Sequence, residues 1–193
     1  MPLIVLDRDG VINEDSPDYI RSLADWRPIA GSIEAIAALS RAGYTIAIAT
    51  NQSGLARGYF GIDELEAIHA ELCRQVEEAN GQVAGIFYCP HLPEAGCECR
   101  KPATGMLAAI ETELAQSPRG AILVGDSLKD LQTAVAYGCR PMLVKTGKGT
   151  ETLKALQAGA AGIPAGEQVP VFDNLAAAAR EILRQQPVSK DDR

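Results

Sequence analysis

Short apolar runs alternate with longer amphipathic segments along most of this chain. The first run, residues 2–6, is apolar without alternation, which is typical of a central strand of a parallel sheet that is buried on both faces. Other segments place apolar residues at helical spacing, as Leu65, Ile68, Leu72 and Val76 do. The repeated strand–helix units predict an α/β fold with a doubly wound, mostly parallel sheet of the Rossmann type.

The predicted elements follow one another in regular order. Strands are predicted over residues 2–6, 44–49, 84–88, 121–125, 141–144 and 169–172. Helices are predicted over residues 32–41, 63–78, 105–114, 130–137, 151–157 and 174–184. At 193 residues and 47% hydrophobic, the chain can bury one good core. We therefore expect a single domain over residues 1–186, followed by a polar, disordered tail over residues 187–193.

The formal net charge of −7, from 18 basic and 25 acidic residues, narrows the possible partners. It argues against a nucleic-acid partner, because proteins that track phosphate backbones carry clustered Lys and Arg. It does not exclude a small phosphorylated substrate, since a bound metal and a few nearby cations can reverse the local field. Together with the lack of a long exposed apolar stripe, this charge favours a monomer.

The sequence shows no targeting or membrane segment. Its N-terminus lacks the basic segment and long apolar region of a secretory signal, and no stretch is apolar enough to span a membrane. We therefore expect a cytoplasmic protein with no membrane partner. In that compartment the five cysteines should be thiols or metal ligands rather than disulfides.

Chemically active side chains stand where the predicted strands end. Asp7 and Asp9 follow the first strand, Thr50 follows the second, Lys101 precedes the helix after the third, and Asp126 follows the fourth. Because the carboxyl ends of parallel strands meet at one edge of the sheet, we expect these groups to surround one point. An acid pair, a hydroxyl, a lysine and a third acid suit Mg²⁺-dependent phosphoryl transfer.

Each of these signals has a plainer interpretation when it is taken alone. An Asp-x-Asp pair after a strand is often only a turn that an Asp side chain stabilises. Asp130 also suits the first turn of a helix, where a negative charge is favourable. The segment 145–150 lacks the spacing of a phosphate-binding loop, so we interpret it as a strand-to-helix connection. The match at four strand ends together favours catalysis.

A second cluster of reactive side chains lies within residues 89–99. Cys89, His91, Cys97 and Cys99 supply three thiols and one imidazole, the number of ligands that a tetrahedral Zn²⁺ requires. Because such a shell has no open position, we predict a structural zinc. The alternatives are a loop of unpaired reduced cysteines or a strained Cys97–Cys99 bridge.

The remaining His and Cys residues have no such neighbours in the sequence. His69 stands on a predicted helix, and we expect it to be a surface residue without partners. We expect Cys73 and Cys139 to be small packing residues.

The strand-end motifs together resemble those of the haloacid dehalogenase (HAD) superfamily of phosphatases. The matching positions are Asp7-x-Asp9-Gly10, Thr50, Lys101 and Gly125-Asp126-x₃-Asp130. The resemblance implies that Asp7 is a nucleophile that forms an aspartyl-phosphate and that Asp9 is the general acid and base. It also implies that Thr50 holds the transferring phosphoryl group and that Lys101 balances its charge. Asp7, Asp126 and the backbone carbonyl of Asp9 would hold Mg²⁺, while Asp130 would orient Lys101 or the metal shell rather than bind the metal directly.

The zinc loop narrows the resemblance to one branch. Together with 7–13, 50–54, 56–58 and 99–102, it is similar to the D-glycero-D-manno-heptose 1,7-bisphosphate 7-phosphatases and the related histidinol-phosphate phosphatases. The resemblance implies a small phosphorylated sugar substrate that loses its C7 phosphate during synthesis of nucleotide-activated heptose, for the lipopolysaccharide inner core or for glycoprotein sugars. The substrate contacts that it implies are Asp15, Ser16, Pro17, Asp18, Asn51, Gln52, Ser53, Arg57, Arg100 and Ser127. Arg100 would meet the distal phosphate or sugar, and Ser127 stands where some relatives have lysine.

The length of the segment between the motifs, and the residues in them, help to distinguish the heptose phosphatase from other possible functions. About forty residues separate Asp9 from Thr50, which leaves no room for a separate cap domain of usual size. The site should therefore be open. Histidinol phosphate would leave Arg100 without an anionic partner, and a zinc-stabilised binding module with a decayed site would not need the costly acids. A phosphotransferase or mutase would need a cap to exclude water from the aspartyl-phosphate.

Overall fold

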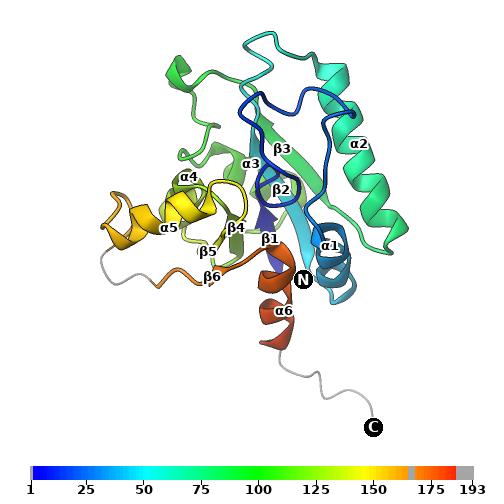
Figure 1. Cartoon of the computed structure of the whole chain (residues 1–193). Coiled ribbons are helices and arrows are strands. Elements are labelled where there is room, and N and C mark those ends of the chain that lie inside the picture. The colour runs from blue at the N-terminus through cyan, green and yellow to red at the C-terminus, as the bar shows by residue number, and fades with distance from the viewer. Residues whose placement is uncertain (1, 165–167, 186–193) are drawn as a thin grey trace.

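A computed structural model describes residues 2–164 and 168–185 of the chain (Figure 1). Its parallel sheet has the strand order β3-β2-β1-β4-β5-β6, so the α/β fold with a parallel sheet is confirmed. The strands are β1 Leu3–Leu6, β2 Thr45–Asn51, β3 Gly85–Cys89, β4 Ile122–Gly125, β5 Arg140–Val144 and β6 Val171–Phe172. The predicted tail, 187–193, lies outside the described residues, so the domain boundary at residue 186 stays a prediction.

The helices within the described residues lie close to their predicted positions. They are α1 Ser32–Arg41, α2 Ile62–Glu78, α3 Gly105–Leu114, α4 Leu128–Tyr137, α5 Gly149–Gln157 and α6 Leu175–Arg184. A short 3₁₀ turn at Pro93–Ala95 was not predicted. Helix α4 begins two residues earlier than predicted because Ser127 caps it reciprocally with Asp130. None of these helices is long and apolar enough to cross a membrane.

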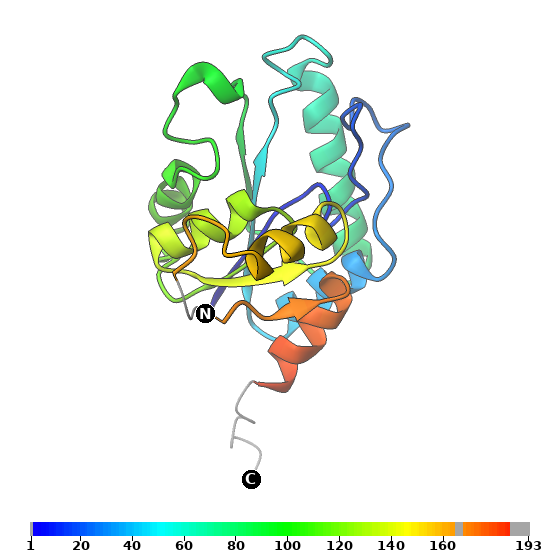
Figure 2. The same ribbon diagram turned by 60° about the vertical axis from the view of Figure 1, so that its left-hand side comes forward.

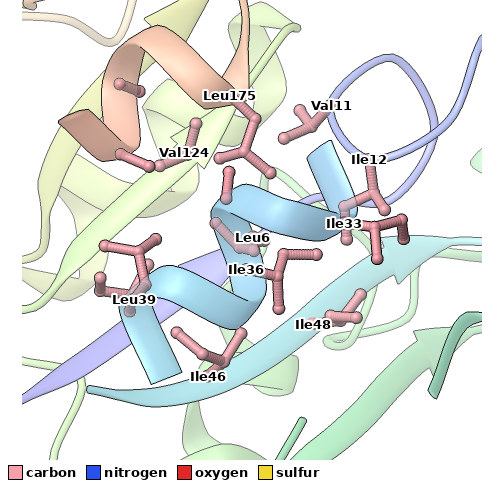
Figure 3. Close-up of a cluster of buried hydrophobic side chains, with 14 of the residues drawn as sticks. Leu6, Val11, Ile12, Ile33, Ile36, Leu39, Ile46, Ile48, Val124 and Leu175 are labelled. Carbon is pink, nitrogen blue, oxygen red and sulfur yellow. The ribbon is translucent and has the colours of Figure 1, made fainter. Parts of the chain in front are cut away.

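Both faces of the sheet are buried, as the uninterrupted apolar strands predict. Along β1, Ile4 and Leu6 face one core and Leu3 and Val5 face the other. Helices α1, α2 and α6 cover the first face, and α3 and α4 cover the second; α1 and α3 stand on opposite sides of the sheet in Figure 1. The first core is the larger, and Figure 3 labels ten of its residues: Leu6, Val11, Ile12, Ile33, Ile36, Leu39, Ile46, Ile48, Val124 and Leu175.

Strand β1 lies between β2 and β4 at the centre of the sheet, so its carboxyl end is flanked by theirs. In Figure 2 the segments that follow β1, β2 and β3 all rise above this edge of the sheet on the same side. No separate cap domain interrupts residues 2–164 or 168–185. The fold therefore gathers the polar strand ends beneath a few loops only.

Candidate active site

Asp7 is the first residue after the central strand, and its carboxylate is held from two sides. Its Oδ1 accepts the backbone N–H of Arg8 at 2.8 Å and lies 2.9 Å from Nζ of Lys101. Its side chain is only 12% exposed. An anionic oxygen is thus presented at the sheet edge by backbone and lysine together, which suits a nucleophile.

Lys101 connects the acids at the sheet edge. Its Nζ lies 2.9 Å from Asp7 Oδ1 and 2.5 Å from Asp130 Oδ1, and it donates to the Ala49 carbonyl at 2.8 Å. Its backbone N–H donates to Oδ1 of Asn51, whose Nδ2 donates back to the Lys101 carbonyl. Burial alone would lower the pKa of Lys101, but the Asp130 and Asp7 carboxylates raise it well above its usual value. Lys101 is therefore a fixed positive charge beside Asp7 and Asp130.

Asp7 and Asp126, at the ends of β1 and β4, converge with Asp130 from the first turn of α4. Each offers a carboxylate oxygen, and these oxygens lie within 4.8 Å of one another. Asp130 Oδ2 accepts the backbone N–H and hydroxyl of Ser127, at 3.0 and 2.6 Å, while Oδ1 pairs with Lys101. Both Asp130 oxygens are thus engaged by protein groups, so Asp7 and Asp126 are better placed to hold a divalent cation. Carboxylate oxygens are the ligands that Mg²⁺ prefers, so Asp7 and Asp126 fit such a cation.

The same crowding makes cation binding depend on pH. Burial first, and then Asp130, raises the pKa of Asp7 to about 7; burial, and then Asp7, raises that of Asp126 to about 8. Below these values a cation must displace protons, so we expect the Mg²⁺ affinity to rise with pH, by roughly tenfold per unit for each proton displaced, and to level off above about pH 8. Isothermal titration calorimetry at four pH values between 6 and 9 measures this. An affinity that stays constant over the range would contradict the expectation.

Asp9 points into a different network. Its carboxylate accepts from Nε and Nη2 of Arg8 at 2.9 and 3.0 Å, from Nδ2 of Asn13 at 2.9 Å and from Nε2 of Gln52 at 2.9 Å. Gln52 Nε2 also lies 2.9 Å from the Thr50 hydroxyl. Burial alone would raise the pKa of Asp9, but the Arg8 charge and the hydrogen bonds from Asn13 and Gln52 lower it further than burial raises it. The two predicted catalytic acids thus experience opposite environments.

These groups open into a cavity of about 780 Å³. Its lining includes all four residues predicted as catalytic, the metal ligand Asp126, and seven of the predicted substrate contacts, namely Asp15, Ser16, Pro17, Asn51, Ser53, Arg100 and Ser127. Three other predicted contacts do not line it. Asp18 lines a separate surface hollow, Gln52 is buried where it holds Asp9, and Arg57 lies on the exposed part of its loop.

Lys148 is a site residue that sequence reasoning missed. Its backbone N–H donates to Asp126 Oδ2 at 2.7 Å, and its Nζ pairs with Asp15 Oδ2 at 3.0 Å across the cavity. The segment 145–150 was interpreted as a plain connection, yet it packs on the loop after β1. Gly10 and Gly147, at φ +82° and +56°, allow this approach, because a Cβ on either would stand about 2 Å from Asp126 Oδ2. The sequence did offer a signal for this residue: segment 145–150 is basic, contains two glycines and follows a predicted strand.

The four predicted zinc ligands do converge. The Sγ atoms of Cys89, Cys97 and Cys99 lie 3.1 to 3.6 Å apart, and Nδ1 of His91 lies 3.2 Å from Cys99 Sγ and 3.6 Å from Cys89 Sγ. A tetrahedral zinc with bonds of about 2.3 Å would place its sulfur ligands about 3.8 Å apart. The donor set and its spacing therefore fit a closed structural zinc site. None of the five cysteines forms a disulfide.

This cluster is continuous with the catalytic edge. Cys89 ends β3 beside Asn51 of β2, and Cys99 precedes Arg100 and Lys101 directly. Arg100 donates from Nη1 to the His91 carbonyl at 3.2 Å. A metal at these ligands would hold both ends of the loop that carries the two cations.

The expectation that His69 is a surface residue without partners is wrong. Its Nε2 lies 3.1 Å from Nη1 of Arg8, and its ring centroid is 5.9 Å from that of Tyr88. The apolar spacing of the helix places His69 outside the row of core residues. It does not show that Arg8, which follows β1, lies against this histidine in the fold. Cys73 and Cys139 do pack against the two cores, as expected.

Comparisons with known proteins identify the family. A model described as HAD-hydrolase-like matches residues 98–178, and one described as polynucleotide kinase 3 phosphatase matches residues 3–135. The chain is 53% identical to the D-glycero-beta-D-manno-heptose-1,7-bisphosphate 7-phosphatase of Pseudomonas putida, over 95% of this chain and 100% of that protein. It is 43% identical to the enzyme of the same name from Neisseria meningitidis, over the full length of both.

A solved structure agrees with these relatives. The D,D-heptose 1,7-bisphosphate phosphatase from B. bronchiseptica, complexed with magnesium and phosphate, superimposes with a TM-score of 0.88 at 46% identity, over 96% of this chain and 100% of that one. The strand-end acids, the parallel sheet and these matches lead to one conclusion. This chain belongs to the D-glycero-β-D-manno-heptose-1,7-bisphosphate 7-phosphatase family of HAD-type phosphatases.

Proposed function

We propose that this protein is a Mg²⁺-dependent phosphatase that removes the C7 phosphate of D-glycero-β-D-manno-heptose 1,7-bisphosphate, through an aspartyl-phosphate, on the route to nucleotide-activated heptose for lipopolysaccharide. The observation that carries the proposal is the convergence of Asp7, Lys101 and Asp126 at one sheet edge, with Asp9 alongside. The names of the relatives support the substrate, and they specify the β anomer, which the sequence leaves open.

In the proposed first step, the Asp7 carboxylate attacks the C7 phosphorus. Arg8, Asn13 and Gln52 favour the ionised form of Asp9 in the free enzyme, so Asp9 must take up a proton when the negatively charged phosphate binds beside it. Asp9 then gives this proton to the departing sugar oxygen and afterwards takes one from the water that hydrolyses the aspartyl-phosphate. Thr50 and Lys101 hold the transferring group and offset its charge. Asp7, Asp126 and the Asp9 backbone carbonyl would hold Mg²⁺, which when bound neutralises phosphate charge.

The positive charges in the cavity lining support a bisphosphate. Arg100, Lys129 and Lys148 line the cavity together with the acids, so cations are present for a second anionic group. Among them Lys148 is already paired with Asp15, and Arg100 with a carbonyl. We propose that Lys129 and Lys148 supply the positive charge that Ser127 lacks where some relatives have lysine.

The substrate assignment is tested by phosphate release with Mg²⁺, comparing kcat/KM for both anomers of heptose 1,7-bisphosphate with that for histidinol phosphate. We expect the β-bisphosphate to be preferred by at least tenfold, about 1.4 kcal/mol of transition-state discrimination. A preference for histidinol phosphate would keep the mechanism and overturn the substrate. Turnover of none of the three would overturn the proposed function.

We also propose that the enzyme acts as a cytoplasmic monomer. The net charge of −7 and the absence of disulfides among the five cysteines support this setting. The same charge supports a small-molecule substrate over a nucleic acid.

A further inference from the structure

Arg8, the residue between the two catalytic acids, is completely buried, with 0% of its side chain exposed. Its guanidinium makes a two-pronged contact with the carboxylate of Asp9, through Nε at 2.9 Å and Nη2 at 3.0 Å. Its third nitrogen, Nη1, turns the other way and lies 3.1 Å from Nε2 of His69 on α2. The mechanism proposed above uses neither Arg8 nor His69.

The chemistry of this contact fixes the state of the His69 ring. A guanidinium can only donate hydrogen bonds, so Nε2 must accept, and the ring must be neutral with its proton on Nδ1. Burial, and then the charge of Arg8, lowers the pKa of His69 to about 4, which agrees with a neutral ring. His69 is therefore a fixed acceptor for a buried arginine, where a missing acceptor would be costly.

Packing against the first core and against β3 holds the elements that carry the contact. His69 follows the fully buried Ile68, which anchors α2 to the first core, and its ring lies against Tyr88 of β3. Arg8 is flanked by the acids, and its own N–H holds Asp7. The arginine is thus held between the helix and the end of β1. Its fork, together with the amides of Asn13 and Gln52, fixes where the Asp9 carboxylate can lie.

We propose that His69 is a positioning residue: through Arg8 it holds the Asp9 carboxyl in the orientation that protonates the departing sugar oxygen. This inference rests on the proposed function, because it requires Asp9 to be the general acid. In that step a bond forms between Asp7 Oδ and phosphorus, the P–O bond to the sugar breaks, and the Asp9 proton moves to the sugar oxygen.

Loss of the proposed role of His69 should change the relative kcat/KM for two substrates, an effect that general damage to the fold would not produce. An alkoxide needs a proton in order to leave, whereas p-nitrophenolate departs readily without one. Because kcat/KM reports only the steps up to departure of the leaving group, comparing it for an alkyl and an aryl phosphate isolates the acid. The loss of a positioned Asp9 should therefore affect the sugar phosphate and spare the aryl phosphate.

The experiment compares kcat/KM for the heptose bisphosphate and for p-nitrophenyl phosphate in the full chain with Mg²⁺. For His69→Leu we expect a loss of tenfold or more with the sugar and a change of less than twofold with the aryl phosphate. His69→Gln, whose Oε1 can accept from Arg8, should restore the sugar value to within threefold. Glu66→Gln, on an exposed position of the same helix, should change neither.

Equal losses with both substrates, no loss with either, or no recovery in His69→Gln would overturn the inference. If His69→Leu does not fold, Arg8→Lys replaces it, since lysine keeps the charge and loses the fork; the same selective loss is expected. Asp9→Asn separates the two proposals. A selective loss in Asp9→Asn without one in the His69 variants leaves the function standing, and no selectivity in Asp9→Asn removes Asp9 as the acid.

Discussion

Asp7→Asn should abolish turnover, with kcat reduced by at least a thousandfold, while the protein remains folded. An amide cannot act as the nucleophile, so no aspartyl-phosphate forms, and losses of this size follow removal of a nucleophile from other covalent enzymes. The shape of the side chain is nearly unchanged, and Lys101 keeps its partner Asp130. Phosphate release and circular dichroism measure the two parts of this prediction.

Stability should respond in a direction set by pH. Burial raises the pKa of Asp7 to about 7 in the folded protein, whereas an unfolded Asp has a pKa of about 4. The ionised carboxyl therefore destabilises the metal-free fold increasingly as the pH rises from about 4 to about 7. At pH 8 the neutral Asn avoids this penalty, and the Tm of metal-free Asp7→Asn should equal or exceed that of the wild type. Asp63→Asn, on the exposed first turn of α2, is the matched control. Residual activity above about 0.1 per cent would contradict the nucleophile assignment.

The main features of this site could be predicted because they lie in contiguous motifs. Continuous apolar strands fix a parallel sheet, and a parallel sheet brings the residues after each strand to one edge. Asp7, Thr50 and Asp126 needed no other information, since each directly follows, or lies at the end of, a strand that pairs as predicted. The zinc ligands were equally accessible, because all four lie in one short loop.

What escaped prediction depends on contacts between distant segments. Arg8 looks like any charged residue in a loop until the fold places His69, 61 positions later, against its guanidinium. Lys148 reaches Asp126 only because Gly10 and Gly147 let two loops approach closely. Such contacts depend on how distant helices and loops are positioned relative to one another in the fold. The hydrophobic periodicity of each segment alone does not give this information.

Cys97→Ser should remove bound zinc, lower the Tm and reduce kcat by at least tenfold, although the hydrogen-bond partners of Cys97 in the described chain are its fellow ligands and the Arg100 backbone. Serine cannot supply the thiolate, and three remaining ligands bind zinc far more weakly than four. The cluster joins the end of β3 to the residues before Lys101, so its loss should release this loop. Lys101 would then be held near Asp7 only by contacts with Asn51, Ala49 and Asp130.

Metal analysis, thermal unfolding and phosphate release with saturating Mg²⁺ measure the three effects. Cys73→Ser is the matched control, because this thiol lies on α2, packs against the first core and is not one of the four cluster residues. It should leave the zinc content and kcat unchanged. Wild-type protein stripped of both metals should stay impaired with Mg²⁺ alone and recover when Zn²⁺ is added first. Full activity in zinc-free protein would show that the other contacts of Lys101 position it without the metal. Zinc would then stabilise the loop and have no part in arranging the catalytic edge.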